Sequence, residues 1–423
     1  MDSQVITPSP LTDKPKIFYG YIVVAACFAI MVIMHGIFNT FGIFFTSLES
    51  AFNVNRAVIS GANSTAFLTM GVSSIIVGIL SDKFGPRKVL TICAVLFGSG
   101  LLLLSQAKTI WQLYLFITLV GIGLSAPDII PLSTVVRWFV KKRGAMSGIM
   151  KVGTGTGMMI MPIVASMLIA TIDWRNAYLV LGTLVLVTVI PLAQLLRRDP
   201  REMGLLPDGE QQQPNTKIPP PVEEGLSLRE ALQTRQLWLV CGYYFTITFC
   251  GISILTHIAP HAMDMDITRT VAAGIVSLIG GTSIAGRLVM GFAGDRIGQK
   301  RGVVICFIIL IIALSLLQVA RQPWMLFLFA AIYGFNHGGF FALISPLIAG
   351  LFGTRSQGTL LGSVIFCGTV GGSTGMVLAG HIFDLTGSYQ IAFIILLVLA
   401  VLGLTAVSFI KPIEKGKRID PRN

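Results

Sequence analysis

Residues 78–88 read "GILSDKFGPRK", and residues 291–301 read "GFAGDRIGQKR", which is the same pattern 213 residues further along the chain. At this offset Asp82 falls on Asp295 and Gly85 on Gly298, and both copies end in two basic residues. A second pair of segments, 121–139 and 334–352, matches at the same offset. One offset shared by two separate places indicates an internal duplication, so we expect two similar halves.

The composition places these halves in a lipid bilayer. Of the 423 residues, 54% are hydrophobic and only 12% are charged, whereas soluble proteins have about 25% charged residues. Segments of roughly 20 apolar residues can cross the hydrocarbon core. Twelve occur, at 17–44, 58–79, 89–106, 112–136, 144–170, 176–196, 236–259, 270–292, 302–319, 324–351, 358–382 and 388–410. We therefore predict an all-α membrane protein with twelve transmembrane helices in two six-helix bundles.

The longest polar stretch, residues 197–235, lies between the sixth and seventh segments. It is too rich in Pro, Gln and Glu to form a core. The sequence thus predicts an N-terminal bundle at 1–196, a linker at 197–235 and a C-terminal bundle at 236–423. Near the end of the linker, Ser227 precedes Glu230 by three residues. This spacing is typical of a capping box, so we expect a short helix there.

The net charge of +12 is distributed unevenly between the two sides of the predicted bilayer. When the loops are assigned alternately to the two sides, most of the 31 Lys and Arg residues fall on the side of the linker and the termini. The other side has only Arg56, Lys108, Arg175, Arg269 and Arg321. This asymmetry predicts a multi-pass protein of the cell (inner) membrane with both termini in the cytoplasm. The position of the cations is explained by a lipid bilayer, so the positive net charge does not indicate a nucleic-acid partner.

The repeated pattern G-x-x-x-D-[KR]-x-G-x-[KR]-[KR] resembles the loop signature of the major facilitator superfamily. The resemblance covers nearly the whole chain and implies the fold of that superfamily. In the superfamily these residues form a charge relay on the cytoplasmic side that latches one conformation. By resemblance, the latch residues are Asp82, Lys83, Arg87, Lys88, Asp295, Arg296, Lys300 and Arg301. The alternative, ordinary anchoring by positive charges, explains the cations but not the Asp and Gly residues at fixed spacing.

A second resemblance concerns residues 138–157, "WFVKKRGAMSGIMKVGTGTG", which are similar to the signature of monocarboxylate transporters. Arg287 also lies where that family has the arginine that receives the substrate carboxylate. The resemblance implies a secondary active transporter that carries a small organic anion by alternating access. A lactate- or pyruvate-like monocarboxylate in symport with a proton is the leading hypothesis, and we expect a functional monomer. Oxalate–formate carriers are related, so a carboxylate antiporter is the alternative.

Three departures from these relatives bear on proton coupling and on the size of the substrate. Mammalian monocarboxylate transporters have an acidic residue four positions before the arginine, where this chain has Ser283. They have a lysine in the first helix, where this chain offers Asn39 as a candidate substrate-binding residue. Oxalate–formate carriers have a further cation in the eleventh helix, yet residues 358–382 contain neither Lys nor Arg.

Three charged residues fall inside predicted spans, which is by default a sign of a functional site. Lys151 lies eight residues after Arg143, Arg287 lies eight residues before Asp295, and Asp128 lies nine residues before Arg137, where Arg143, Asp295 and Arg137 mark the linker-side ends of the helices. With a rise of 1.5 Å per residue, all three should lie ~12 Å deep, near the level where transporters of this kind bind substrate. We therefore expect Asp128 to neutralise Lys151.

Two interpretations of these charges remain open. The Asp128–Lys151 pair is either a static link between two helices or a pair that responds to substrate and protons, since a neighbouring cation controls the titration of a buried carboxylate. Arg287 is either structural or a bidentate donor to a substrate carboxylate. We assign Arg287 and Lys151 to substrate binding and Asp128 to proton coupling.

Two histidines belong to segments that line the cavity in this superfamily. His35 is a candidate for proton coupling and His337 for substrate binding, because histidine titrates near neutral pH. The alternative for each is a core histidine whose hydrogen bonds are satisfied.

Other classes of function fit the sequence less well. We find no metal-ligand cluster, nucleophile elbow or phosphate loop, so we expect neither an enzyme nor a cofactor. A cationic-drug exporter of the superfamily would be expected to show an acidic cavity and a Gly-Pro pair in its fifth helix, where this chain has Met161 before Pro162. A transporter-like sensor of an external metabolite is a further alternative.

Overall fold

The computed structural model describes residues 18–54, 56–210 and 225–411. Most of these residues are helical, turns and loops join the helices, and the only β-structure in these ranges is an isolated bridge between Gly225 and Gly353. Within these ranges, eleven helices are long and apolar enough to cross a membrane. One of them, α6, has 53 residues and is broken at Asp173, whose φ of 72° and ψ of 158° no α-helix accommodates. It therefore supplies two spans, and the prediction of twelve transmembrane helices is confirmed.

The first half contains six helices, and their bounds follow the predicted segments closely. The first span is α1 continued by the beginning of α2, with a break at Asn39 and Thr40. The helices are α1 (Tyr19–Phe38), α2 (Phe41–Phe52), α3 (Arg56–Phe84), α4 (Pro86–Ser105), α5 (Ile110–Trp138) and α6 (Arg143–Leu195). Several of these helices extend one or two turns beyond the apolar segments, because the backbone hydrogen bonds of a helix can continue into polar residues.

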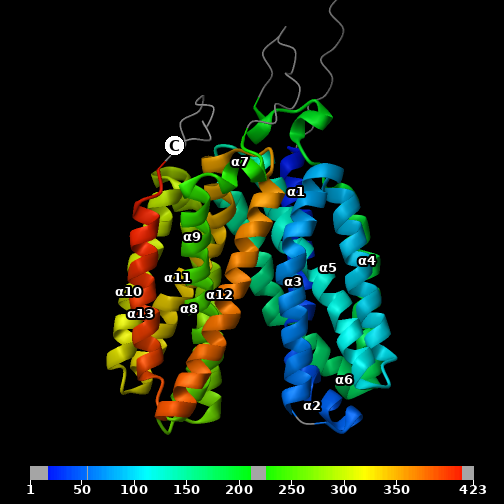
Figure 1. Ribbon diagram of the computed structural model, residues 1–423. Helices are drawn as coiled ribbons and strands as arrows, with labels where there is room; N and C mark the ends of the chain where they lie inside the picture. The colour runs from blue at the N-terminus through cyan, green and yellow to red at the C-terminus, as the bar shows by residue number, and fades with distance from the viewer. Residues whose placement is uncertain (1–17, 55, 211–224, 412–423) are drawn as a thin grey trace, which may run out of the picture.

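The second half repeats the arrangement. Its helices are α8 (Arg235–Met263), α9 (Arg269–Ile297), α10 (Gln299–Val319), α11 (Pro323–Phe352), α12 (Gln357–Thr386) and α13 (Gln390–Ser408). In the first half α1, α4 and α5 pack with α6, and in the second half α9 packs with α11 and α8 with α12. Figure 1 shows the two resulting bundles, which meet where α3 contacts α12 and α6 contacts α9.

The duplication inferred from the sequence has a counterpart in one contact. Ser345 Oγ donates a hydrogen bond of 3.1 Å to the carbonyl oxygen of Leu132. These residues are 213 positions apart, the offset of the sequence repeat. A residue touches its own counterpart only close to the axis that relates the two halves, so this contact marks a pseudo-twofold axis between the bundles.

The linker lies at the end of the bundles where α1 begins and α13 ends, and we call this end the linker face (Figure 1). Its described parts are η1 (Pro200–Met203), η2 (Pro207–Gly209) and α7 (Leu228–Leu232). The predicted capping box is present: Ser227 Oγ accepts from Glu230 N at 3.3 Å, and Ser227 N donates to Glu230 Oε2 at 2.7 Å. These bonds lower the pKa of Glu230.

Both ends of the linker are attached to a bundle. Asp208 Oδ2 accepts hydrogen bonds of 2.9 Å from the backbone N–H groups of Val140 and Lys141, between α5 and α6. Leu226 N donates to Phe352 O at 2.9 Å, at the end of α11. Glu210 forms a 2.7 Å ion pair with Lys141 and raises the pKa of that lysine. The division at 196/197 and 235/236 stays a prediction.

Candidate functional site

Three titratable side chains from three helices of the first bundle meet at one carboxylate oxygen. Lys151 of α6 donates a hydrogen bond to Oδ1 of Asp128 in α5. His35 Nε2 of α1 lies 3.3 Å from the same oxygen, in a contact that is not an aligned hydrogen bond. The Lys151 side chain is only 6% exposed and that of Asp128 is 21% exposed. The pair predicted from depth is thus formed, and we call Asp128, Lys151 and His35 the central cluster.

Glycines in α6 allow this approach. A Cβ atom on Gly153 would lie 2.5 Å from Phe28 O of α1, and one on Gly157 would lie 2.3 Å from Val32 O. On another side of α6, a Cβ on Gly148 would lie 2.4 Å from Arg287 O of α9. Only glycine permits such close helix crossings. They hold Lys151 beside α1 and bring α6 against the second bundle.

Arg287 reaches from the second bundle to the first. It is 5% exposed, its Nη1 donates to Ser283 Oγ at 3.0 Å, and its Nε has no partner in the described part of the chain. A Cβ on Gly155 of α6 would lie 2.9 Å from Nη1, so the guanidinium packs against α6. Its charge interacts with Asp128. The group therefore keeps a donor for a planar anion next to the central cluster.

The two other predicted substrate-binding residues lie in different surroundings. The half-buried ring of His337 packs against Tyr333 and Phe341, with centroids 5.8 and 5.0 Å away. The Phe341 ring also lies 5.9 Å from Lys151 Nζ, so an aromatic side chain connects His337 with the central cluster across the bundles. Asn39 is exposed, and its Nδ2 donates to His35 O at 2.7 Å, which engages it with its own helix.

At the linker face, each signature aspartate caps a helix of the other bundle. Asp82 of α3 accepts hydrogen bonds from Gly358 N at 3.1 Å and Thr359 N at 2.7 Å, in the first turn of α12. Asp295 of α9 accepts from Gly144 N at 2.6 Å and Ala145 N at 2.7 Å, in the first turn of α6. A carboxylate is favourable there because helix N-termini have unpaired N–H groups and partial positive charge.

The cation that binds Asp82 was not among the predicted site residues. Arg137 Nη2 donates to Asp82 Oδ1 at 2.9 Å and to Thr354 O of the second bundle, also at 2.9 Å. The side chain is 5% exposed. Arg137 becomes part of the site because α5 continues to Trp138, two residues past the apolar segment at 112–136.

The basic residues of the predicted latch lie elsewhere. Arg87 Nε donates to Leu196 O at 2.5 Å, and Lys300 Nζ donates to Ser408 O at 2.9 Å, so each binds the end of the last helix of its own bundle. Four others are exposed at the linker face: Lys83, Lys88, Arg296 and Arg301. The aspartates, rather than these cations, make the hydrogen bonds between the bundles, and the latch role of the group stays a prediction.

We expect Asp82→Asn to shift the protein toward conformations that are open at the linker face. The substitution removes the charge that Arg137 and the α12 N-terminus share, and leaves Arg137 a buried cation without its acid. Cysteine-accessibility profiles on both faces measure the shift. Asp295→Asn is the matched variant, because within the described residues no arginine donates a hydrogen bond to Asp295, and its shift should be smaller. Profiles of Asp82→Asn that coincide with wild type on both faces would refute the latch.

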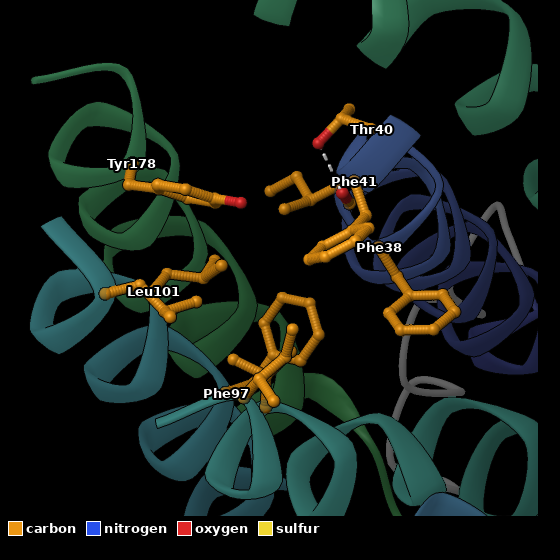
Figure 2. Close-up of a pocket in the computed structure, with 10 residues that line it drawn as sticks. Phe38, Thr40, Phe41, Phe97, Leu101 and Tyr178 are labelled. Carbon is orange, nitrogen blue, oxygen red and sulfur yellow. Dashed lines mark hydrogen bonds between the residues drawn. The ribbon is translucent and has the colours of Figure 1, made fainter. Parts of the chain in front are cut away.

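A separate pocket lies inside the first bundle, beside the break between α1 and α2 (Figure 2). It is apolar, has a volume of about 20 Å³ and is lined by Phe97, Leu101 and Phe41 among others. A water molecule needs ~15 Å³, so the space suffices for about one. The buried Tyr178 hydroxyl points into it and has no partner in the described structure. The pocket offers no charge, so a charged solute fits the central cluster and not this space.

Comparisons with known proteins agree with this architecture. The family model described as "Major Facilitator Superfamily" matches residues 26–291 and 264–423. Rat "Monocarboxylate transporter 13" is 28% identical over 388 residues, which are 91% of this chain and 87% of the rat protein. Rat "Monocarboxylate transporter 12" is 24% identical over an alignment of 440 residues, covering 98% of this chain and 90% of its own.

Among solved structures, the human organic anion transporter MFSD10 (TETRAN) superposes with a TM-score of 0.72. The match covers 93% of this chain and all of the human chain at 15% sequence identity. At that identity the likeness shows the fold alone.

Proposed function

The chain belongs to the major facilitator superfamily, and on that premise we propose that it carries a small monocarboxylate, lactate- or pyruvate-like, in symport with a proton. Membership makes it a multi-pass membrane protein of a transporter family. The superfamily moves solutes by rocking two bundles around a site between them, and the central cluster and Arg287 lie where the bundles meet.

The charge balance around Arg287 carries the proposal. Two cations, Lys151 and Arg287, share one acid, Asp128, in surroundings that are nearly closed to solvent. Because Lys151 is hydrogen-bonded to Asp128, the positive charge of Arg287 is left in excess. A single carboxylate would neutralise it, and the planar guanidinium suits two carboxylate oxygens. A cationic substrate would meet repulsion at the same place.

The proposal of proton coupling rests on two basic side chains that contact the same carboxylate oxygen. Asp128 Oδ1 contacts both Lys151 and His35, so a proton gained or lost by one member changes the electrostatic environment of the other two. A carboxylate bound to Arg287 adds a negative charge nearby and favours protonation of the cluster. Release of the anion then favours release of the proton, so the anion and the proton would be carried in the same direction.

Alternating access needs a contact that one conformation makes and another breaks. The caps by Asp82 and Asp295 close the bundles together at the linker face, as the converging helices in Figure 1 illustrate. The charge asymmetry supports a cytoplasmic position for that face and for both termini. The protein would then load its substrate from the opposite side of the cell membrane and would act as a monomer.

The test is uptake by purified protein in proteoliposomes, with labelled carboxylates of two to six carbons. We expect saturable uptake of two- to four-carbon monocarboxylates, competition by unlabelled analogues and little inhibition by dicarboxylates or organic cations. Counterflow of oxalate-like dicarboxylates without monocarboxylate uptake would instead favour the antiporter.

A further inference from the structure

A second charged cavity lies at the linker face of the first bundle, away from the central cluster. It is formed where α4 begins and α6 ends, and its volume is about 170 Å³. That is roughly ten times the ~15 Å³ that one water molecule needs. Its lining includes Arg87, Lys88, Arg197 and Arg198, with Glu202 as the acidic member. The cationic side chains in this lining outnumber the acidic one, and such a lining favours an anion.

The geometry of Arg87 shows a donor that is held in place and left without a partner. Its Nε donates to Leu196 O at 2.5 Å, which fixes the guanidinium beside the cavity. Its Nη2 is buried and has no hydrogen-bond partner within the described ranges. A buried guanidinium N–H without an acceptor is costly, and an anion in the cavity would supply one once the Arg87 side chain turns toward it. The first turn of α4 adds N–H groups, because Gly85 caps it without a side chain.

The second half does not repeat the pair of arginines that lines the cavity. In the second half Lys300 donates to Ser408 O as Arg87 donates to Leu196 O. At the offset of 213 residues, however, Arg197 and Arg198 fall on Ile410 and Lys411. The duplicated fold therefore does not require the arginine pair, and an ordinary role in anchoring the bundle would apply equally to both halves.

We propose that this cavity binds a phosphate-bearing anion, taken from the headgroup of an anionic lipid or from a soluble phosphate. Several donors converge there, and a phosphate group presents several acceptor oxygens to them. Basic pockets between transmembrane helices at a cytoplasmic surface have the chemistry that anionic headgroups require. Phe84 lines the same cavity and is 51% exposed, so an acyl chain could lie against it while the headgroup enters.

Native mass spectrometry of the full chain in detergent, titrated with phosphatidylglycerol or phosphatidylcholine, tests the proposal. We expect one phosphatidylglycerol to bind more tightly than phosphatidylcholine. The double variant Arg197→Gln/Arg198→Gln should bind it roughly 30-fold more weakly, since each cation near an anionic lipid contributes about a factor of five. The Arg197 carbonyl, which accepts from Trp138 Nε1 at 2.9 Å, is unchanged in this variant.

The matched control is Arg229→Gln/Arg301→Gln, which removes two exposed cations of the linker face outside the cavity. It should bind phosphatidylglycerol as wild type does. Thermal unfolding with millimolar inorganic phosphate distinguishes the sources: stabilisation of wild type but not of the cavity variant supports a soluble phosphate, and selective lipid binding alone supports a headgroup. The proposal is overturned if the cavity variant binds phosphatidylglycerol like wild type while phosphate stabilises neither, or if the control loses as much affinity.

Discussion

Replacing Arg287 by lysine should lower carboxylate uptake at least roughly 100-fold, because a charged bidentate hydrogen bond contributes ~3 kcal/mol and an ammonium cannot reproduce it. The charge is kept, so folding should be unaffected. The guanidinium is buried, held by Ser283 and placed against Gly155, and these contacts fix its plane. Uptake in proteoliposomes and the unfolding temperature in detergent measure the two effects. Undiminished uptake would remove Arg287 as the carboxylate receptor.

A change in the neighbouring helix gives an independent test of the same position. Gly155→Ala places a methyl group 2.9 Å from Arg287 Nη1, which must then move. We expect a higher KM for the carboxylate and an almost unchanged unfolding temperature, because the displaced atoms are the end of a flexible side chain. Gly280→Ala on α9 is the control, since nothing lies within 4 Å of its added methyl group. Equal KM values for both variants would mean that the guanidinium does not need its present position.

Asp128→Asn should cost about 3–5 kcal/mol of stability or disable transport, because it leaves Lys151 a buried cation without its acid. Lys151→Met should cost less, because Asp128 keeps its contact with His35 Nε2. Unfolding temperatures of the two single variants, compared with wild type, measure the difference. Two equal, wild-type values would mean that the charges of the central cluster do not depend on each other.

The double variant Asp128→Asn/Lys151→Met separates a structural pair from a coupling pair. It removes both charges, so stability should recover relative to Asp128→Asn alone. Recovery of acid-driven uptake as well would show that the pair only joins α5 to α6. Recovery of folding without acid-driven uptake is the result we expect, since Asp128 is proposed to carry the proton.

The sequence predicted those features of the fold and site that depend on distance along the chain. The lengths of the apolar segments predicted the transmembrane helices, and the offset of 213 residues predicted the two halves. Counting residues from the helix ends placed Asp128 and Lys151 at one depth. Since residues at one depth on adjacent helices can meet, the pair followed. Depth also placed Arg287 at their level, and its charge does interact with Asp128.

Features that depend on direction around a helix, or on where a helix stops, could not be predicted. The contact of His35 with Asp128 depends on which side of α1 faces α5, and a helix that is apolar all round gives no such direction. Arg137 joined the linker-face contacts because α5 continued past its apolar segment. The cavity around Arg197 needs the end of α6 to fold back beside α4, which only tertiary packing decides.

The most direct test of proton-linked carboxylate transport is the flux of both species in one proteoliposome experiment. Purified protein is reconstituted with a pH-sensitive dye inside, a labelled two- to four-carbon monocarboxylate is added outside, and the outside is acidified. We predict that the pH gradient accelerates uptake and that one proton enters with each anion, with empty liposomes as the baseline. Flux of the anion with no dependence on the gradient, or no flux of any monocarboxylate above empty liposomes, would contradict the account.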